Sequence, residues 1–366
     1  MRKSRLSLIS LILVLSVILM LFAGCSTKGP EGTKSEGQPA KAQAGPYSLR
    51  MFSAGESGMT YVSMSAITGI IRNHKPEIWK DVTTIPSAGP YAGFRAIQSR
   101  EGEGTYSNIP QMVELWKDTG NFAKDPIPKQ NKALLGPCLW EHQNVLLARA
   151  DRDDLKSIWD LKGKKVCPTL PGYVTEVVSK MIHEKLDLPV QMVYVEMSAI
   201  SDALKNGMID ATWGYVLSSV GVPSWMTELE MRLDAKVVPF SKEDAELIAS
   251  KVEGVAAAPL SLKKFSTKLK GPETSWSPVL GTYWVFSPDL PEQAVYEIMV
   301  ALYEHRKEVG EVHPAHCIWA EDALGVQERH IEVAAKAGIP IHPGFAKWLK
   351  EQKVWHDNWL VGEVNQ

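Results

Sequence analysis

The chain has 366 residues and a formal net charge of −2 at pH 7, with 40 Lys and Arg against 42 Asp and Glu. Proteins that bind nucleic acid carry a basic surface, so this slightly acidic composition excludes nucleic acid as an expected partner. The length exceeds what one hydrophobic core usually supports, which predicts a body of two lobes.

Residues 1–24 have the pattern of an export signal. A basic start is followed by a largely apolar run at 8–21 and by two small residues before Cys25. The end of this segment resembles the lipobox of bacterial lipoproteins, which implies cleavage before Cys25 and attachment of lipid to it. We therefore expect an extracytoplasmic protein, in the periplasm or on the outer face of the cell membrane. The alternative is an uncleaved transmembrane anchor, because the apolar run approaches the length that spans a bilayer.

Residues 25–46 are rich in Gly, Pro, Ser, Lys, Gln and Ala and show no apolar periodicity. Such a segment cannot bury enough surface to order itself, and we interpret it as a disordered tether. The body then begins with predicted strands at 47–53 and 79–85, each followed by a predicted helix, at 60–73 and 90–100. This alternation predicts an α/β fold with largely parallel strands.

A second α/β unit is predicted beyond an extended segment at 132–147. After a strand that ends at Val166, its predicted helices cover 175–185 and 198–206, and its predicted strands cover 192–195 and 209–213. Strand-like residues 283–286 precede a helical pattern over 292–308, 314–324, 326–337 and 344–352. We accordingly assign 47–147 and 275–366 to one lobe and 148–274 to the other.

Three glycine-containing turns each connect a predicted strand to a predicted helix, at 53–61, 87–91 and 169–175. Free backbone N–H groups and the positive end of a helix at such a turn can hold a polar or anionic ligand group. Ligands of open α/β sheets bind beyond the carboxyl ends of strands, so these turns indicate a binding cleft between the lobes. The alternative at the first turn is an ordinary helix start capped by Ser57 or Thr60.

Other residues could carry chemistry. Trp213 and Tyr215 follow a predicted strand end, where an aromatic ring can either cover a ligand or pack in the core. The segment 313–317 contains two His residues and one Cys, which zinc accepts as ligands, but packing at a helix start explains them better and we expect no metal. No catalytic motif indicates hydrolysis, so we expect neither enzyme activity nor a cofactor. After Cys25 the cysteines are Cys138, Cys167 and Cys317, so at most one pair can form.

The order of motifs resembles that of the TAXI family, the solute-binding proteins of TRAP (tripartite ATP-independent) secondary transporters. The resemblance spans about residues 47–350. It rests on the first turn, which is similar to a glycine-rich turn of the family that ends in tyrosine, and on three further segments. These are DLKGKKV at 160–166, LKNGMIDA at 204–211 and IHPGF at 341–345.

The resemblance implies a two-lobed, hinged receptor of the type II periplasmic-binding-protein fold, with α/β lobes and a helical C-terminal region. It implies a small-molecule solute (an organic acid, amino acid or aromatic acid), TRAP permease subunits as partners, and a lipid anchor at Cys25. Together with the aromatic and cationic candidates, it gives the predicted ligand-binding residues Gly55, Glu56, Ser57, Gly58, Met59, Tyr61, Ser87, Tyr91, Arg95, Arg149, Gly172, Tyr173, Val174, Thr175, Trp213 and Tyr215.

Some residues depart from the family pattern. Tyr173 and Val174 stand where the family has small residues, residues 89–91 replace a serine-rich helix start, and Glu56 adds a negative charge to the first turn. An aromatic lining suits an apolar, aromatic or partly cationic solute better than an organic acid.

The sequence allows alternatives for two arginines and for the function. Arg95 and Arg149 are the cations expected to reach a carboxylate if the solute has one, although each can instead be an exposed or hinge ion-pair residue. The alternative functions are an anchored hydrolase or lyase that uses His316, Cys317 or Glu56, and a receptor that reports to a membrane sensor kinase.

Overall fold

The computed structural model describes residues 45–56, 59–171 and 173–365. The predicted signal segment, Cys25 and the tether up to residue 44 lie outside the described residues. So do Ser57, Gly58 and Gly172, three of the predicted ligand-binding residues. Within the described ranges, no helix has both the length and the apolar composition needed to cross a membrane.

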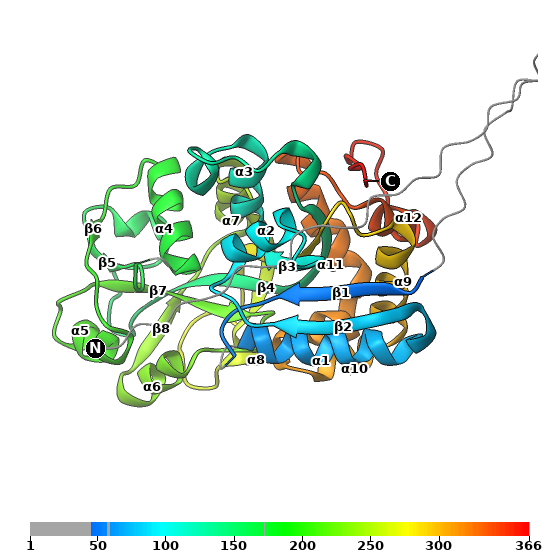
Figure 1. Cartoon of the computed structure of the whole chain (residues 1–366). Coiled ribbons are helices and arrows are strands. Elements are labelled where there is room, and N and C mark those ends of the chain that lie inside the picture. The colour runs from blue at the N-terminus through cyan, green and yellow to red at the C-terminus, as the bar shows by residue number, and fades with distance from the viewer. Residues whose placement is uncertain (1–44, 57–58, 172, 366) are drawn as a thin grey trace, which may run out of the picture. The chain divides into compact units, whose positions relative to one another are not determined.

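The described residues form one mixed sheet of ten strands (Figure 1). Neighbouring strands follow the order β2-β1-β3-β10-β4-β7-β5-β6, with β8 paired to β4 and β9 paired to β10. The strands are β1 Tyr47–Phe52, β2 Trp79–Ile85, β3 Gly104–Ser107, β4 Leu134–Arg149, β5 Lys165–Cys167, β6 Gln191–Met192, β7 Ala211–Leu217, β8 Ala235–Val238, β9 Ala256–Ser261 and β10 Thr274–Phe286. The strands predicted for the two lobes thus belong to one continuous sheet.

The strand directions place two sets of strand ends opposite each other. β1 pairs in parallel with β2 and β3, and β10 runs antiparallel to both β3 and β4, so β4 has the direction of β1. β7 is antiparallel to β4 and parallel to β5. The carboxyl ends of β1, β2 and β3 therefore point toward the carboxyl ends of β5 and β7 along the long strands β4 and β10.

Helices connect and cover the strands, and α1 runs beside β2 (Figure 1). The helices are α1 Met59–His74, α2 Pro90–Gln98, α3 Ile109–Lys117, α4 Val174–Lys185, α5 Ile200–Lys205, α6 Ser224–Arg232, α7 Lys242–Lys251, α8 Leu262–Phe265, α9 Glu292–Glu304, α10 Arg306–Glu311, α11 Cys317–Lys336 and α12 Pro343–Glu351. The α/β fold class is confirmed. The predicted helical C-terminal region is confirmed as well, because α9 to α12 follow β10.

Two predicted helix boundaries need correction. The predicted helix at 292–308 is divided at His305 into α9 and α10. The break predicted near residue 325 is instead a kink at Asp322 within α11, where the backbone has φ −152° and ψ 52°. The Asp322 carboxylate accepts a hydrogen bond from the Gly325 N–H (3.2 Å), as a capping residue does at a helix start.

The sequence pattern does not predict β3, β8 or β9. β3 has four residues and begins at Gly104, a residue type that is depleted in strands. A Cβ atom at Gly104 would lie 2.5 Å from Met51 Sδ and 2.9 Å from Val285 O, so close packing between strands requires the glycine. β9 contains Pro259, which argues against a strand when it is read from sequence alone.

The buried hydrophobic side chains form separate clusters. One cluster combines residues of 47–140 with residues of 283–359. Two others, on opposite faces of β4, consist of residues from 145–280. β4 contributes Leu139 to the first cluster and Leu146 to one of the other two. The long strands thus connect regions that have hydrophobic cores of their own.

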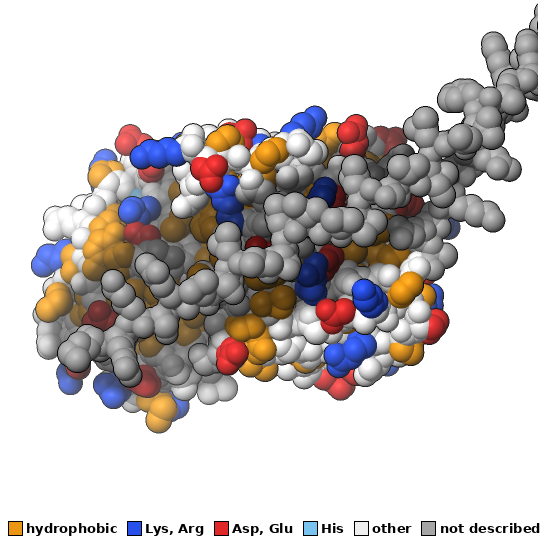
Figure 2. Space-filling model, viewed as in Figure 1, with side chains coloured by type: hydrophobic (Ala, Val, Ile, Leu, Met, Phe, Trp, Pro, Cys, Tyr) orange, Lys and Arg blue, Asp and Glu red, His pale blue; other side chains and the backbone are white. Residues whose placement is uncertain are grey.

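Charged side chains are spread over the surface. Figure 2 shows Lys and Arg interspersed with Asp and Glu on the face that it presents. Several ion pairs join exposed groups, such as Lys263 with Glu273 (2.7 Å). Pairs of this kind contribute at most about 1 kcal/mol each, so the folded state depends mainly on the buried clusters.

Candidate functional site

The first two predicted turns meet at the carboxyl ends of β1 and β2. Phe52 and Ile85, the last residues of these strands, are paired in parallel. Beyond them, the Ser53 N–H donates to Ile85 O (2.9 Å), and the Ser87 hydroxyl donates to Ser53 O. The Ser53 hydroxyl is fully buried and has no hydrogen-bond partner among the described residues. It is a free polar group at this turn that the sequence-based list of ligand-binding residues omits.

The predicted residues of the first turn differ in exposure. Gly55 and Glu56 are exposed, whereas Met59 and Tyr61, in the first turn of α1, are half-buried. The Ser63 hydroxyl donates to Met59 Sδ (3.4 Å). No ion pair joins Glu56 to another described residue.

Two predicted residues on α2 are already engaged by neighbouring side chains. The Tyr91 hydroxyl donates to Glu114 Oε2 (3.2 Å), and burial together with the Glu114 charge raises the pKa of Tyr91 to about 12. Arg95 pairs with Asp125 Oδ2 at 3.0 Å, and its guanidinium lies 5.2 Å from the centre of the Phe122 ring. The structure thus gives Arg95 an ion-pair partner of its own chain.

A second cluster lies where β4 meets β7 and the start of α4. His142 on β4 stacks on Tyr215 of β7, with ring centroids 4.6 Å apart and planes inclined by 24°. Its Nε2 atom is hydrogen-bonded to the hydroxyl of Thr175, in the first turn of α4, at 3.0 Å. Burial raises the pKa of Tyr215, and the nearby phenol of Tyr173 adds to this effect. Two predicted residues, Thr175 and Tyr215, therefore contact one histidine, and a third, Tyr173, lies near Tyr215.

Sequence reasoning missed His142, although a lone histidine within the extended apolar segment at 132–147 is a signal that could have found it. Protein atoms pack around His142, but part of its surface remains accessible to solvent. Burial lowers its pKa to about 4, so its ring is neutral at pH 7. A neutral imidazole offers one N–H donor and one acceptor. Since Nδ1 makes no hydrogen bond to the described residues, it is available to another molecule.

The remaining candidates of this region have different surroundings. Trp213 is fully buried, and its indole N–H donates to His183 Nε2 at 3.1 Å, which corresponds to the core-packing alternative. Arg149 pairs with Asp151 through two hydrogen bonds of 2.9 Å. Val174 is 37% exposed at the start of α4. Arg149 is the last residue of β4 and lies well away from His142, so it is not part of the ring cluster.

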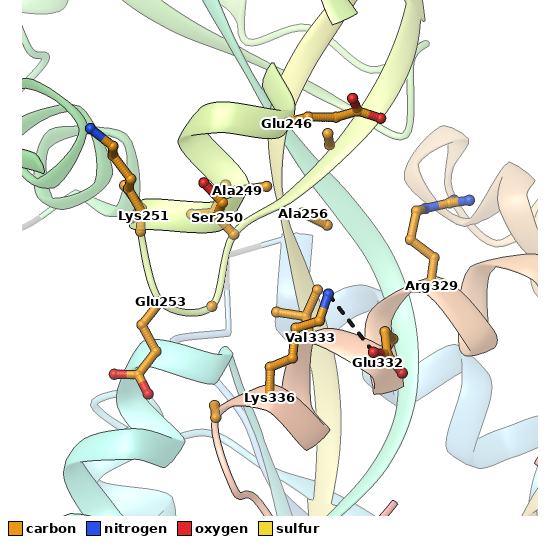
Figure 3. Close-up of a pocket in the computed structure, with 15 residues that line it drawn as sticks. Glu246, Ala249, Ser250, Lys251, Glu253, Ala256, Arg329, Glu332, Val333 and Lys336 are labelled. Carbon is orange, nitrogen blue, oxygen red and sulfur yellow. Dashed lines mark ion pairs between the residues drawn. The ribbon is translucent and has the colours of Figure 1, made fainter. Parts of the chain in front are cut away.

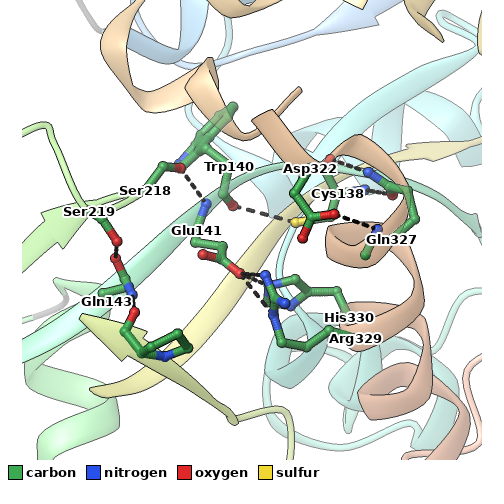
Figure 4. A network of polar contacts seen from close by, with 12 residues as sticks. Cys138, Trp140, Glu141, Gln143, Ser218, Ser219, Asp322, Gln327, Arg329 and His330 are labelled. Carbon is green, nitrogen blue, oxygen red and sulfur yellow. Dashed lines mark hydrogen bonds and ion pairs between the residues drawn. The ribbon is translucent and has the colours of Figure 1, made fainter. Parts of the chain in front are cut away.

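Glu141, the residue before His142, points to the opposite face of β4 and is the centre of a buried polar network (Figure 4). Its carboxylate accepts hydrogen bonds from Arg329 Nη2 (2.6 Å) and lies 2.9 Å from His330 Nε2, both on α11. His330 Nδ1 lies 3.2 Å from the Tyr283 hydroxyl. Burial by itself would raise the pKa of Glu141, but His330 and Arg329 lower it to about 2. This face of β4 is therefore fixed to α11 by charge.

A hollow of about 760 Å³ lies between the segment from α7 to β9 and the second half of α11 (Figure 3). Arg329, Glu332 and Lys336 line it from α11, and Glu253 lines it from the opposite side. These groups have partners in the chain, since Lys336 pairs with Glu332 (3.8 Å) and Lys117 pairs with Glu253 (2.7 Å). None of the predicted ligand-binding residues lines this hollow.

The histidine and cysteine segment before α11 is packed against the body. His316 is fully buried, and its Nδ1 atom is 3.1 Å from Leu139 O. Cys317 is half-buried, and burial raises the pKa of its thiol. In the part of the chain that the structure describes, no three His, Cys, Asp or Glu side chains are arranged to hold a metal ion. The three cysteines of that part are free thiols.

Several solved structures are similar to this chain at low sequence identity. The probable amino-acid ABC transporter extracellular-binding protein ytmK from Bacillus subtilis is 14% identical with a TM-score of 0.43, over 75% of this chain and 98% of that one. The periplasmic aliphatic sulphonate binding protein SsuA from Escherichia coli is 13% identical with a TM-score of 0.40, over 83% and 82%. XAC2383 from Xanthomonas citri bound to ATP is 10% identical with a TM-score of 0.46, over 79% and 96%.

A family assignment comes from the sequence. Residues 51–352, most of the chain, match the NMT1-like family. The match begins within β1 and ends just past α12, so it includes both turns at the ends of β1 and β2, the ring cluster at His142 and the network at Glu141. The chain therefore belongs to the NMT1-like family.

Proposed function

We propose that this protein is the solute-binding subunit of a TRAP-type secondary transporter of the TAXI group. It captures a small solute between two lobes, formed by 47–147 with 275–366 and by 148–274, and delivers the solute to a membrane permease. The lipid on Cys25 holds the protein at a membrane surface outside the cytoplasm. The protein is a receptor and returns its ligand chemically unchanged.

The opposed strand ends are the observation that carries this proposal. The turns after β1 and β2 are joined through Ser53 and Ser87, and the ring cluster around His142 lies at the start of α4, after β5. Because ligands of α/β sheets bind beyond the carboxyl ends of strands, both sets of ends contribute to one site. The export signal and the order of the family motifs support the same function.

Hinge closure follows from the two long strands. β4 pairs with β10 up to His142 and with β7 from His142 onward. A change of backbone twist near this residue alters the separation of the two sets of strand ends. Contacts from both sides offset the free energy needed for closure, so the closed form becomes populated when solute is bound.

Two features support a receptor over an anchored hydrolase or lyase. Cys317 is a poor nucleophile, because burial raises the pKa of its thiol and disfavours the reactive thiolate. His316 is fully buried and held against a backbone carbonyl, so it lacks access to a substrate.

The first test is native mass spectrometry of the purified protein, followed by thermal unfolding with the solute that co-purifies. We expect a bound small molecule and a rise in melting temperature, since a ligand at a hundredfold excess over Kd stabilises the folded state by about 2.7 kcal/mol. The solute should be recovered unchanged after incubation. A protein that carries no solute and responds to no organic acid, amino acid or aromatic acid contradicts the proposal.

The second test measures closure. Spin labels at Val62 on α1 and Val177 on α4 report on both lobes, and labels at Val62 and Leu360 report within one lobe; all three side chains are exposed. Replacement of Cys317 by Ser removes the half-buried thiol. We expect solute to shorten the first distance and to leave the second unchanged.

Capture of a permease by the lipidated protein supports transport, whereas capture of a sensor kinase alone contradicts it.

A further inference from the structure

We propose that the cluster of His142, Tyr215 and Tyr173 recognises an uncharged planar ring, so that the solute is an uncharged aromatic or heteroaromatic molecule and not a dicarboxylate. This inference rests on the proposed solute-binding function and names the chemical class of its ligand. It follows from the shape of the cluster, from the protonation state of His142 and from the acidic partner that Lys180 has on α4.

The geometry of the cluster suits a flat ligand. His142 and Tyr215 are nearly parallel, at 24°, with a centroid distance of 4.6 Å, and Thr175 fixes the orientation of the imidazole through Nε2 at 3.0 Å. Tyr173, which lies near Tyr215, is 46% exposed. Aromatic rings that are partly accessible and held in place offer a stacking surface to another ring.

The polar atoms of the cluster are neutral. Burial is the cause that lowers the pKa of His142, so its imidazole carries no charge at pH 7. The Tyr215 hydroxyl stays protonated for the same reason. Nδ1 of His142 and the hydroxyl of Tyr215 make no hydrogen bond to the described residues. They therefore offer hydrogen-bonding groups to a ligand without offering a counter-charge to a carboxylate.

The start of α4, next to the cluster, already has an anionic group of its own chain. Lys180 pairs with Glu176, which is in the first turn of α4 and is 5% exposed. The carboxylate of Glu176 matches the positive end of that helix. A carboxylate of the solute at the cluster would lose its hydration without gaining an opposite charge, which is unfavourable.

Matched pairs of small probes test this inference, because each pair shares one ring and differs in charge. Benzamide and nicotinamide are uncharged, whereas benzoate and nicotinate carry a carboxylate. Titration calorimetry on the protein, after removal of any co-purified solute by partial unfolding and refolding, gives Kd for each probe. We expect each amide to bind at least about tenfold more tightly than its acid.

Variants of Tyr215 test whether the cluster causes the preference for the uncharged amides. Tyr215→Leu removes the stacking ring and should weaken amide binding by about tenfold, while Tyr215→Phe keeps the ring and should change it by less than about threefold. Tyr296→Leu, on α9, is the control for general effects of losing a tyrosine and should leave Kd unchanged. Circular dichroism checks that each variant is folded.

The other outcomes overturn the inference in distinguishable ways. Binding of both acids as tightly as the amides, or of succinate in preference to all four probes, contradicts the uncharged ligand but leaves solute binding intact. Equal losses for Tyr215→Leu and Tyr296→Leu remove the cluster from the site. Absence of binding by every probe overturns the inference, and together with absence of a co-purified solute it also overturns the proposed function.

Discussion

Glu141 and His142 are neighbours on β4, and protein surrounds both side chains, yet the chain supplies charged partners to only one of them. Glu141 receives Arg329 and His330 from α11, and its pKa falls to about 2. His142 receives a tyrosine ring and the hydroxyl of Thr175, and burial lowers its pKa to about 4. One residue is therefore charged and the next is neutral at pH 7.

One strand thus serves two purposes. A buried charge requires an opposite charge and hydrogen bonds, and the face toward α11 meets that requirement within the chain. The face toward α4 leaves polar atoms unsatisfied and without charge, a condition that suits an exchangeable ligand better than a structural contact.

Glu141→Gln should lower the free energy of unfolding by about 3–5 kcal/mol, because removal of one partner leaves Arg329 and His330 without the carboxylate that compensates them. Denaturation in urea measures this change. The control is Glu273→Gln, which breaks an exposed pair with Lys263 and should change stability by no more than about 0.5 kcal/mol. Similar effects of the two variants would show that Glu141 contributes no more than a surface charge.

Glu141 and His142 should also change the free energy of unfolding in different pH ranges. The folded pKa of His142 is lowered from 6.5 to about 4, so the unfolded chain binds the extra proton and stability falls as pH drops from 6.5 to 4. The folded pKa of Glu141 is lowered from 4.5 to about 2, so its contribution is complete above 4.5 and is lost toward pH 2.

The free energy of unfolding of variants of Glu141 and His142, measured from pH 7 down to pH 3, tests these two pH ranges. His142→Gln should flatten the upper part of the profile and Glu141→Gln the lower part, each by up to about 1.4 kcal/mol per pH unit. Buried histidines such as His316 and His342 also have lowered pKa values and remain in both variants, so the comparison with the unmodified protein isolates one group. Identical profiles for the two variants would refute the contrast.

A double-mutant cycle measures how strongly Glu141 is coupled to its partner. Arg329→Met keeps the aliphatic stem and removes the charge, and together with Glu141→Gln it should destabilise the protein by at least about 1 kcal/mol less than the sum of the single effects. Lys263→Met with Glu273→Gln is the exposed control pair and should be additive within about 0.5 kcal/mol. Additivity at Glu141 and Arg329 would mean that the short contact between them carries no specific energy.

The parts of the fold with strong local patterns could be predicted from sequence, and the parts that depend on distant partners could not. The alternation at 47–53 and 79–85 predicts β1 and β2 within a residue, and α1 and α2 follow them as expected. β3 is short and begins with Gly104, so no local pattern distinguishes it. Its place in the sheet depends on pairing with β1 and β10.

The candidate site shows the same limit. Thr175 was predicted from its position at a helix start. Tyr215 was predicted to lie just past a strand end, but it lies within β7. Their contact with His142 depends on the register of β4 against β7, in which His142 is paired with Leu217. Register between segments so far apart in sequence follows from the packing of the whole core. The ion pair of Arg149 with Asp151, in contrast, involves residues two positions apart and could be expected from sequence.

The smallest expected effects concern Arg95 and Arg149, the two cations predicted to reach a carboxylate. Arg95→Gln and Arg149→Gln each remove a partly exposed ion pair, with Asp125 and Asp151 respectively. Each variant should therefore change the free energy of unfolding by less than about 1 kcal/mol. Each should change Kd for the co-purified solute, or for benzamide, by less than about twofold. Calorimetry on both variants beside Tyr215→Leu measures this. A tenfold loss of affinity in either arginine variant would place a charge at the ligand and would remove the contrast between the two faces of β4.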